Sequence, residues 1–193
     1  LNDKLLQCLE LMQAEGFSLN DSSYVSSLKA CSDLVEIAMG QKLHIGIMKR
    51  GFDAFLHVNN TLIDMYAKCC LFNEAWGVLE SLTSRDVVSW NAMIAGHALQ
   101  GNYRVVRWYL HDMQSHGLNP DNRTYTSILA SCGHAGALEE CLDFFRNMNE
   151  VKPDLEHFNC MIDVLGRAGL LEEAKVLLQS MPVQADITCW VSL

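Results

Sequence analysis

Three asparagines and one threonine occupy matching positions of a pattern that repeats along this sequence, and each is followed by an aspartate just before the pattern starts again. The pairs are Asn60 with Asp86, Asn91 with Asp121, Thr126 with Asp154, and Asn159 with Asp186. A side-chain amide offers two donors and an acceptor, and a nearby carboxylate can fix its orientation directly or through a water. Such a pair is suited to recognising the polar edge of a ligand such as a nucleobase.

The aspartates also have a purely structural explanation. Aspartate immediately before a helix is a favoured N-cap, worth about 1 kcal/mol, so all four could be present to start the next helix. The asparagines are harder to explain in this way, because asparagine is a mediocre helix former inside the second turn of a helix. Capping and recognition are compatible, and both interpretations stay open.

The elements that carry these pairs are clearest in residues 87–121, which read as two amphipathic helices joined by a tight turn. Apolar side chains recur at helical spacing from Trp90 to His97 and form one stripe along the first helix. Gly101 ends this helix, because glycine accepts a left-handed C-terminal conformation, and Pro120 closes the second one. The stretch is therefore predicted to be one helix-turn-helix repeat.

The same repeat recurs on both sides, and each first helix has the same length because ten positions always separate its fifth residue from its turn residue. The ranges are 1–20 (a second helix only), 21–55, 56–86, 87–121, 122–154, 155–186 and 187–193 (the start of another first helix). Helical repeats of this length predict an all-α fold: a right-handed superhelical solenoid of stacked antiparallel helix pairs, with about eleven helices in one elongated module. Because the chain starts at Leu1 without a methionine, we expect it to be a piece of a longer protein.

The turn residue differs between repeats. It is glycine at Gly101, Gly136 and Gly169, but cysteine at Cys70. A left-handed conformation at a residue other than glycine costs about 1 kcal/mol, so we expect the Cys70 turn to be less regular than the others.

The composition limits the classes of function. Half of the residues are hydrophobic, but no apolar run is long enough to span a bilayer, so no membrane association is expected. The formal net charge is −9, whereas non-specific nucleic-acid binding depends on cationic phosphate contacts. The eight cysteines contain no CxxC pair, which favours a reducing compartment, and Cys31 and Cys132 are expected to be small core residues.

No catalytic or metal site is expected. A zinc deaminase needs a His-x-Glu and a Pro-Cys-x-x-Cys motif, and the sequence contains neither. His111 and His116 would face different sides of a helix, so they are not expected to share a metal. We therefore expect no enzyme activity and no cofactor in this chain.

Several stretches resemble pentatricopeptide repeats of the plant type that mixes standard, long and short repeats. They are NTLIDMYAKC, VVSWNAMIAG, GLNPD, RTYTSILASCGHAG, HFNCMIDVLGRAGLLEEA and SMPVQAD. In the terms of that family, the repeats are long (21–55 and 122–154), short (56–86 and 155–186) and standard (87–121), and residues 187–193 resemble the start of a C-terminal extension motif. The resemblance covers nearly the whole chain. It implies an RNA-binding factor of a plant mitochondrion or chloroplast, most often one that recognises sites of cytidine-to-uridine editing, with its transit peptide outside this piece.

The resemblance also implies that each repeat reads one base of single-stranded RNA through its fifth and last residues. An Asn/Asp pair would prefer a pyrimidine, uridine above cytidine, and Thr126 with Asp154 would prefer guanine. Weaker RNA contacts are expected from Val88, Arg123 and Asn20. The repeat with Val25 and Phe55 carries no readable pair. From the 5′ side, the expected core is pyrimidine, pyrimidine, guanine or any base, pyrimidine.

The resemblance and the composition also indicate which partners and which alternative functions to consider. The resemblance suggests multiple-organellar-editing-factor proteins and a deaminase domain, in the same chain or another, as partners. RNA splicing or stabilisation would use the same surface. A helical scaffold that binds a protein is the alternative of another class, and the acidic charge favours it. Unpaired apolar faces at the ends of the piece would allow self-association.

Overall fold

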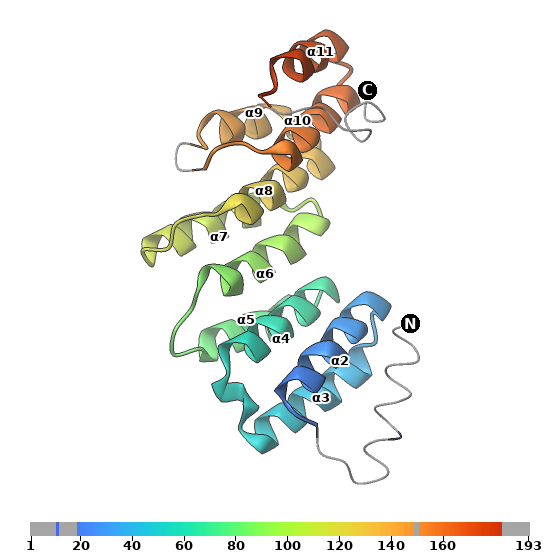
Figure 1. The fold of residues 1–193 in the computed structure, drawn as a ribbon, viewed down its shortest axis with the longest axis vertical. Coiled ribbons are helices and arrows are strands. Elements are labelled where there is room, and N and C mark those ends of the chain that lie inside the picture. The colour runs from blue at the N-terminus through green and yellow to red at the C-terminus, as the bar shows by residue number, and fades with distance from the viewer. Residues whose placement is uncertain (1–10, 12–18, 149–150, 183–193) are drawn as a thin grey trace. The chain divides into compact units, whose positions relative to one another are not determined.

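The computed structural model describes residues 11, 19–148 and 151–182 (Figure 1). Every regular element in these ranges is a helix, so the predicted all-α fold is confirmed. The helices are α2 (Asp21–Leu34), α3 (Ile37–Arg50), the short 3-10 helix η1 (Phe52–Ala54), α4 (Leu56–Lys68), α5 (Phe72–Ser81), α6 (Val87–Leu99), α7 (Tyr103–Ser115), α8 (Asn122–Ala135), α9 (Leu138–Arg146), α10 (Leu155–Arg167) and α11 (Leu171–Ser180). No helix in the described ranges combines the length and the apolar character that a membrane crossing requires.

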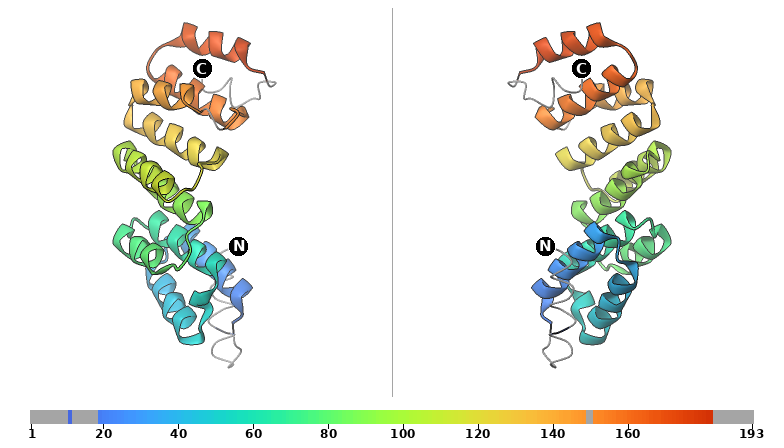
Figure 2. Two further views of the ribbon diagram at one scale, coloured as in Figure 1. Left: turned by 90° about the vertical axis from the view of Figure 1, so that its left-hand side faces the viewer. Right: turned by 90° about the vertical axis from the view of Figure 1, so that its right-hand side faces the viewer.

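The chain divides within α6 into two compact parts, Leu1–Gly96 and His97–Leu193, and each is described by itself. In the N-terminal part, α2 packs against α3 and α4, and α4 packs against α5. In the C-terminal part, α8 packs against α7, α9 and α10, and α10 packs against α11 (Figures 1 and 2). Within the two parts, α3, α5, α9 and α11 therefore each lie against their own first helix, and the first helices α2 and α4, like α8 and α10, contact each other.

The core of each part is built from the apolar stripe of the first helices and from small residues of the second helices. At the fourth place of four repeats lie aromatic side chains that are buried: Tyr24, Trp90, Tyr125 and Phe158. One turn into the second helices lie residues with no exposed surface, namely Ala75, Val106, Cys141 and Ala174. Cys31 and Cys132 are fully buried, which confirms their interpretation as core residues.

The turns between paired helices share one backbone conformation. The turn residue has a positive φ in all five: Val35 (57°), Cys70 (60°), Gly101 (65°), Gly136 (66°) and Gly169 (75°). The left-handed conformation predicted for Cys70 is therefore confirmed.

The expectation that the Cys70 turn is less regular is wrong. The Cys70 N–H donates to the Ala67 carbonyl at 3.1 Å, and the next N–H, of Leu71, donates to the Tyr66 carbonyl at 2.9 Å. The turn at Gly136 makes the equivalent two bonds, at 3.2 and 2.9 Å. Because the Cys70 side chain is exposed, its Cβ strains only the local backbone and leaves these bonds intact.

Successive first helices approach very closely at one point of the N-terminal part. A Cβ built on Gly96, near the end of α6, would lie only 2.5 Å from the Cβ of Ala67 on α4. Only glycine therefore allows the two backbones to pack at this distance. The close contact holds α4 and α6 together near their C-terminal ends.

Candidate functional site

The aspartates at the last place of the repeats begin the following first helix. Asp121 and Asp154 are the N-caps of α8 and α10. Asp86 acts in the same way at α6, since its Oδ1 accepts a hydrogen bond from the Ser89 N–H at 2.8 Å. The capping interpretation is therefore confirmed for these three residues. Asp186 lies outside the described residues.

Asn60 and Asp86 form a direct side-chain pair between α4 and the start of α6. The Asn60 amide nitrogen donates to Oδ1 of Asp86 at 3.1 Å, with Oδ2 at 3.4 Å. The Ser89 hydroxyl lies 2.7 Å from both the Asn60 amide oxygen and Asp86 Oδ1. A hydroxyl is the only one of these neighbours that can donate to the amide oxygen, and a carboxylate can only accept. The carboxylate and the hydroxyl therefore fix which end of the amide faces which neighbour.

The fifth residues of the repeats differ in their solvent exposure. Asn60 is only 7% exposed, whereas Asn91, Thr126 and Asn159 are partly exposed. Because one of the two N–H groups of the Asn60 amide is enough for Asp86, the other remains for a further acceptor. The protein has already desolvated and oriented this amide, so a ligand that reaches it meets a rigid group.

Asp121 has the same kind of surroundings as Asp86. Its Oδ1 accepts hydrogen bonds from the Thr124 N–H and the Thr124 hydroxyl, both at 2.9 Å, and the Asp121 N–H donates to that hydroxyl at 3.1 Å. Asn91 belongs to the N-terminal part and Asp121 to the C-terminal part. Their pairing therefore stays a prediction.

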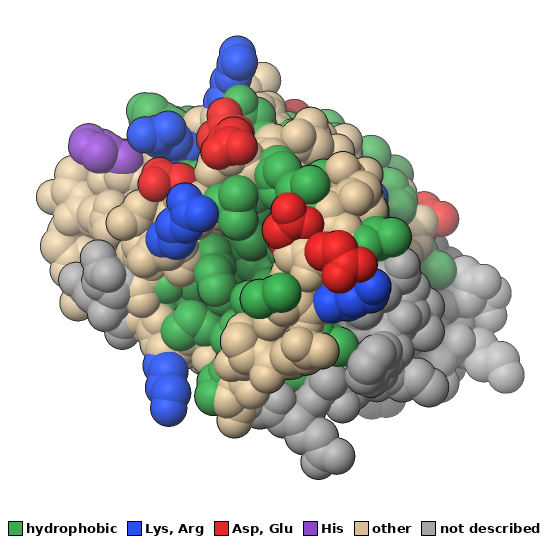
Figure 3. Space-filling view, turned by 90° about the horizontal axis from the view of Figure 1, so that it is seen from above, with side chains coloured by type: hydrophobic (Ala, Val, Ile, Leu, Met, Phe, Trp, Pro, Cys, Tyr) green, Lys and Arg blue, Asp and Glu red, His purple; other side chains and the backbone are tan. Residues whose placement is uncertain are grey.

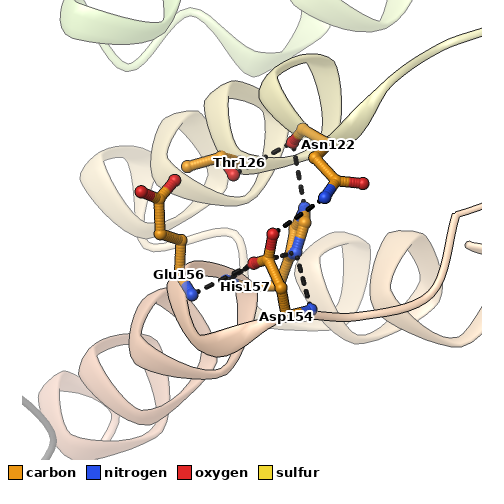
Figure 4. A network of polar contacts seen from close by, with 5 residues as sticks. All are labelled: Asn122, Thr126, Asp154, Glu156 and His157. Carbon is orange, nitrogen blue, oxygen red and sulfur yellow. Dashed lines mark hydrogen bonds and ion pairs between the residues drawn. The ribbon is translucent and has the colours of Figure 1, made fainter. Parts of the chain in front are cut away.

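Asp154 pairs with a residue that sequence reasoning did not select. Its Oδ2 accepts a hydrogen bond from the side-chain amide of Asn122, the first residue of α8, at 2.9 Å (Figure 4). The hydroxyl of Thr126 instead donates to the main-chain carbonyl of Asn122 at 3.0 Å. Among the described hydrogen bonds, those of Asp154 therefore reach Asn122 and not Thr126. A role for Thr126 in base recognition stays a prediction.

His157, near the start of α10, contacts both Asp154 and Asn122. Its side chain is fully buried, with Nδ1 2.7 Å from Asp154 Oδ1 and Nε2 3.0 Å from the Asn122 carbonyl oxygen. Asp154 Oδ1 also accepts hydrogen bonds from the main-chain N–H groups of Glu156 and His157, at 3.1 and 3.3 Å. The imidazole thus lies between the two helices and restricts the position of the carboxylate (Figure 4).

The residues that the sequence interpretation missed share one position, the third place of a repeat. Ser89, Thr124 and His157 all stand there, and each contacts the aspartate three residues before it. The signal that could have found them is the capping-box spacing, in which a polar side chain at the third helical position reaches back to the N-cap. Asn122 gave no such signal, because its contact depends on how α8 and α10 pack.

The residues that are expected to make weaker RNA contacts are exposed. Val88 is 52% exposed at the start of α6, and Arg123 is exposed at the start of α8. Asn20 is exposed and caps α2, with its Oδ1 2.8 Å from the Ser23 N–H. Phe55, at the last place of its repeat, is 46% exposed. Their contacts with RNA stay predictions.

The start of α10 is an acidic environment. Burial, and then the carboxylates of Asp163, Glu156 and Asp154, raise the pKa of the Cys160 thiol to about 11. This thiol is therefore protonated at neutral pH and is a poor nucleophile. The side chains around the Asp154 pair favour specific hydrogen bonds rather than non-specific attraction of phosphates.

Three relatives from Arabidopsis thaliana align with nearly all of the chain. The pentatricopeptide repeat-containing protein At2g13600 is 40% identical over 192 residues, which cover 95% of this chain and 28% of the relative. Protein At2g03880, named mitochondrial, is 35% identical over 100% of the chain and 31% of its own length, and At5g13270, named chloroplastic, is 36% identical over 89% and 23%. The chain spans less than a third of the length of these relatives.

Solved structures agree with the helical architecture. The crystal structure of the pentatricopeptide repeat protein PPR10 of maize, in complex with an 18-nt psaJ RNA element, superposes with a TM-score of 0.71 over 99% of this chain and 29% of PPR10. The sequence identity is 21%, so this likeness concerns the fold alone.

Family models cover most of the chain. The model described as PPR repeat family matches residues 85–134, and two models described as PPR repeat match residues 60–87, 123–151 and 149–182. These ranges join without a gap from 60 to 182, which is more than half of the 193 residues. The chain therefore belongs to the pentatricopeptide repeat family.

Proposed function

We propose that this chain binds single-stranded RNA in a sequence-specific way, with one base per repeat read at the fifth place and oriented from the last place. The observation that carries this proposal is the Asn60 amide, held between the Asp86 carboxylate at 3.1 Å and the Ser89 hydroxyl at 2.7 Å. An amide with a fixed donor end and a fixed acceptor end can distinguish base edges by their hydrogen-bonding pattern.

The proposed RNA core begins with two pyrimidines. Asn60 with Asp86 reads the first, and Asn91 with Asp121 reads the second, since both pairs combine an amide with a carboxylate. Asn159 with Asp186 reads the fourth base as a pyrimidine as well. The third base belongs to the repeat at 122–154, where Thr126 with Asp154 reads guanine or accepts any base.

The charge of the chain implies that base contacts provide most of its specificity. A net charge of −9 opposes binding to a phosphate backbone, so the affinity of the chain alone is low and depends only weakly on salt. Exposed Arg123, beside the reading position of its repeat, is one cation that can contact a phosphate. High affinity then requires further repeats or a protein partner.

We infer that the chain serves as the site-recognition part of an organellar RNA processing factor, one for cytidine-to-uridine editing. The names of two relatives, mitochondrial in one case and chloroplastic in the other, support a plant organelle. The reaction itself would come from a deaminase domain in the same or another chain, with multiple-organellar-editing-factor proteins as partners. Splicing or stabilisation of a transcript would use the same bases and the same pairs.

A protein-binding scaffold is the second candidate, and one surface feature favours it. Viewed from above, apolar side chains gather in a hollow with charged side chains around it (Figure 3). Leu171 and Val176 on α11 are 44% and 65% exposed. Apolar surface of this kind is suited to another helix, from a partner or from a second copy of the chain.

Fluorescence anisotropy with short labelled RNAs at stated salt tests the proposal. RNAs with pyrimidines at the first, second and fourth positions of the core should bind more tightly than RNAs with purines there. Asn91→Thr, with Asp121 kept, should move the preference at the second position from pyrimidine toward guanine and leave the first position unchanged. Equal binding to all sequences by the folded chain, with an unchanged profile in Asn91→Thr, would contradict base recognition and favour the scaffold.

A further inference from the structure

We propose that a second copy of this chain binds to one face of α7, which gives a two-fold symmetric dimer with Trp108 on the symmetry axis. This α7 face is defined by Arg104, Trp108 and Asp112 of the helix Tyr103–Ser115. The inference is independent of the proposed RNA binding, because no residue of the α7 face belongs to a proposed reading pair.

The centre of the α7 face is a tryptophan that the fold leaves half exposed. Trp108 is 52% exposed, whereas the residues that follow it, Tyr109 and Leu110, are 6% and 8% exposed. The Trp108 ring lies 5.0 Å from the Tyr109 ring in an edge-on arrangement, with 68° between the two planes. Tryptophan offers a large apolar area with few rotatable bonds, and it is among the residues that contribute most to protein interfaces. A half-exposed indole on the surface of a helix is therefore suited to contact with another protein chain.

Two opposite charges stand at equal distances on either side of this tryptophan. Arg104 comes four residues before Trp108 and Asp112 comes four residues after it, so all three lie on one face of the helix. Arg104 is exposed, and its guanidinium contacts the aromatic ring and the hydroxyl of Tyr103. The Asp112 side chain is 27% exposed, and its Oδ1 lies 3.8 Å from Nδ1 of His116. Because this contact is long, the carboxylate can exchange it for a guanidinium from another chain.

This spacing makes the α7 face complementary to itself. A two-fold axis through Trp108 pairs two antiparallel copies of α7, and each residue before Trp108 then faces the residue equally far after it in the other copy. Arg104 therefore faces Asp112 of the partner subunit, and the same pair forms a second time by symmetry. A parallel, in-register arrangement would instead bring the two arginines together. The indoles supply the apolar contact, and the charge pairs fix its orientation.

The same charges favour a second copy over a partner of one sign. An acidic partner would be repelled by Asp112 and a basic partner by Arg104, whereas a second copy offers the opposite charge at both positions. The net charge of −9 opposes unspecific association of two copies, so local complementarity is needed. A contact between one pair of helices is smaller than the interface of a permanent dimer, so the fraction of dimer should rise with concentration.

Sedimentation velocity of the complete 193-residue chain, over a wide range of concentrations, measures this dimer. We expect the wild type to dimerise reversibly. Trp108→Ala should lower the association constant by roughly tenfold or more, the effect of truncating a central tryptophan. Arg104→Asp should lower it by about tenfold or more as well, because it places two carboxylates opposite each other at both pairs. Arg104→Asp combined with Asp112→Arg should restore the dimer, since each pair again joins opposite charges.

The matched control is Arg107→Asp. Arg107 is also an exposed cation of α7, but it lies about 100° around the helix from Trp108 and does not face Asp112 of the partner subunit. This variant has the same net charge as Arg104→Asp, so the difference between the two reports the position of the charge alone. We expect Arg107→Asp to dimerise more strongly than Arg104→Asp, and circular dichroism shows that each variant is folded.

Three results would overturn the proposal. The first is a wild type that stays monomeric at every concentration, and the second is a dimer that Trp108→Ala leaves intact, which would place the contact on another surface. The third is a double exchange that does not recover the association lost in Arg104→Asp. RNA anisotropy keeps this test separate from the proposed function, because Trp108→Ala should retain the base preferences of the wild type.

Discussion

The side-chain nitrogen of Asn60 lies 3.1 Å from the carboxylate oxygen Oδ1 of Asp86, 26 residues further along the chain. The contact forms because Asp86 starts the helix that follows in the array, where its carboxylate caps α6 and reaches α4 at the same time. One side chain thus both begins a helix and orients an amide on the preceding repeat. The helix N-cap and the carboxylate that orients this amide are therefore the same residue.

Ser89→Ala tests whether the residue at the third place positions the reading amide. Ser89 is fully buried, and its hydroxyl contacts both Asn60 and Asp86, so its loss leaves the amide oxygen without this donor. We expect the free energy of unfolding to fall by about 1–2 kcal/mol. We also expect weaker discrimination at the first base of the core, because the amide is no longer held in one orientation.

The matched control for this variant is Ser23→Ala. Ser23 makes the same third-place contact, with its hydroxyl 2.7 Å from the Asn20 side-chain oxygen, but it touches no reading pair among the described residues. Urea unfolding and RNA anisotropy are measured for both variants. A first-base profile that is identical in wild type and Ser89→Ala would show that the hydroxyl has only a structural role.

Gly96→Ala should destabilise the chain by about 1–3 kcal/mol, through overpacking between α4 and α6. The added Cβ would lie 2.5 Å from the Cβ of Ala67, whose main-chain carbon is also within 3.0 Å, so no flexible side chain can move aside. Gly77→Ala is the control, because it lies inside α5 with nothing within 4 Å of a new Cβ. That variant should gain about 0.5–1 kcal/mol from helix propensity. Equal effects of the two substitutions on the urea midpoint would contradict the close approach.

Cys70→Gly should stabilise the chain by about 0.5–1 kcal/mol, because Cys70 holds a φ of 60° that glycine adopts without a Cβ penalty. Gly136→Ala is the reverse experiment. Its φ is 66° and a new Cβ meets nothing within 4 Å, so any loss of stability comes from the backbone alone. Denaturant titration in the presence of a reductant measures both. A destabilised Cys70→Gly would mean that the thiol makes a favourable contact that outweighs the backbone strain.

His44 should make stability fall as the solution becomes acidic. Burial lowers the pKa of His44 below 6.5, although the charge of Asp53 acts in the opposite direction. The unfolded chain, with a histidine pKa of about 6.5, therefore binds the proton more readily than the folded chain. The contribution of His44 to stability is complete above that pH and is lost progressively as the pH drops through 6.5 toward the folded pKa.

The His44→Gln variant isolates this effect. Glutamine can keep a hydrogen bond to the Tyr66 hydroxyl, which lies 2.9 Å from His44 Nδ1, but it does not titrate. The difference in unfolding free energy between wild type and variant should become less favourable to the wild type between pH 7 and pH 5. A constant difference over this range would argue against a lowered pKa for the half-buried imidazole.

Much of this molecule could be predicted from local features of its sequence. The period of the repeats, the apolar stripe and the turn residues predict the helix pairs, and an aspartate before each first helix predicts the N-caps at Asp86, Asp121 and Asp154. These features depend on residues only a few positions apart, whose interactions are governed by backbone geometry and helical spacing. The sequence is sufficient for them because no distant contact has to be known.

The tertiary structure alone decided which side chain each of these carboxylates meets. Asn60 reaches Asp86 from the fifth place of its helix, whereas Asp154 is reached by Asn122 from the first place of α8. Both positions lie on one helix face, so periodicity cannot distinguish them. The choice depends on how closely two successive first helices approach and on the residue packed between their starts, a serine in one case and the imidazole of His157 in the other. Such distances follow from the packing of whole side chains and cannot be read from their spacing in the sequence.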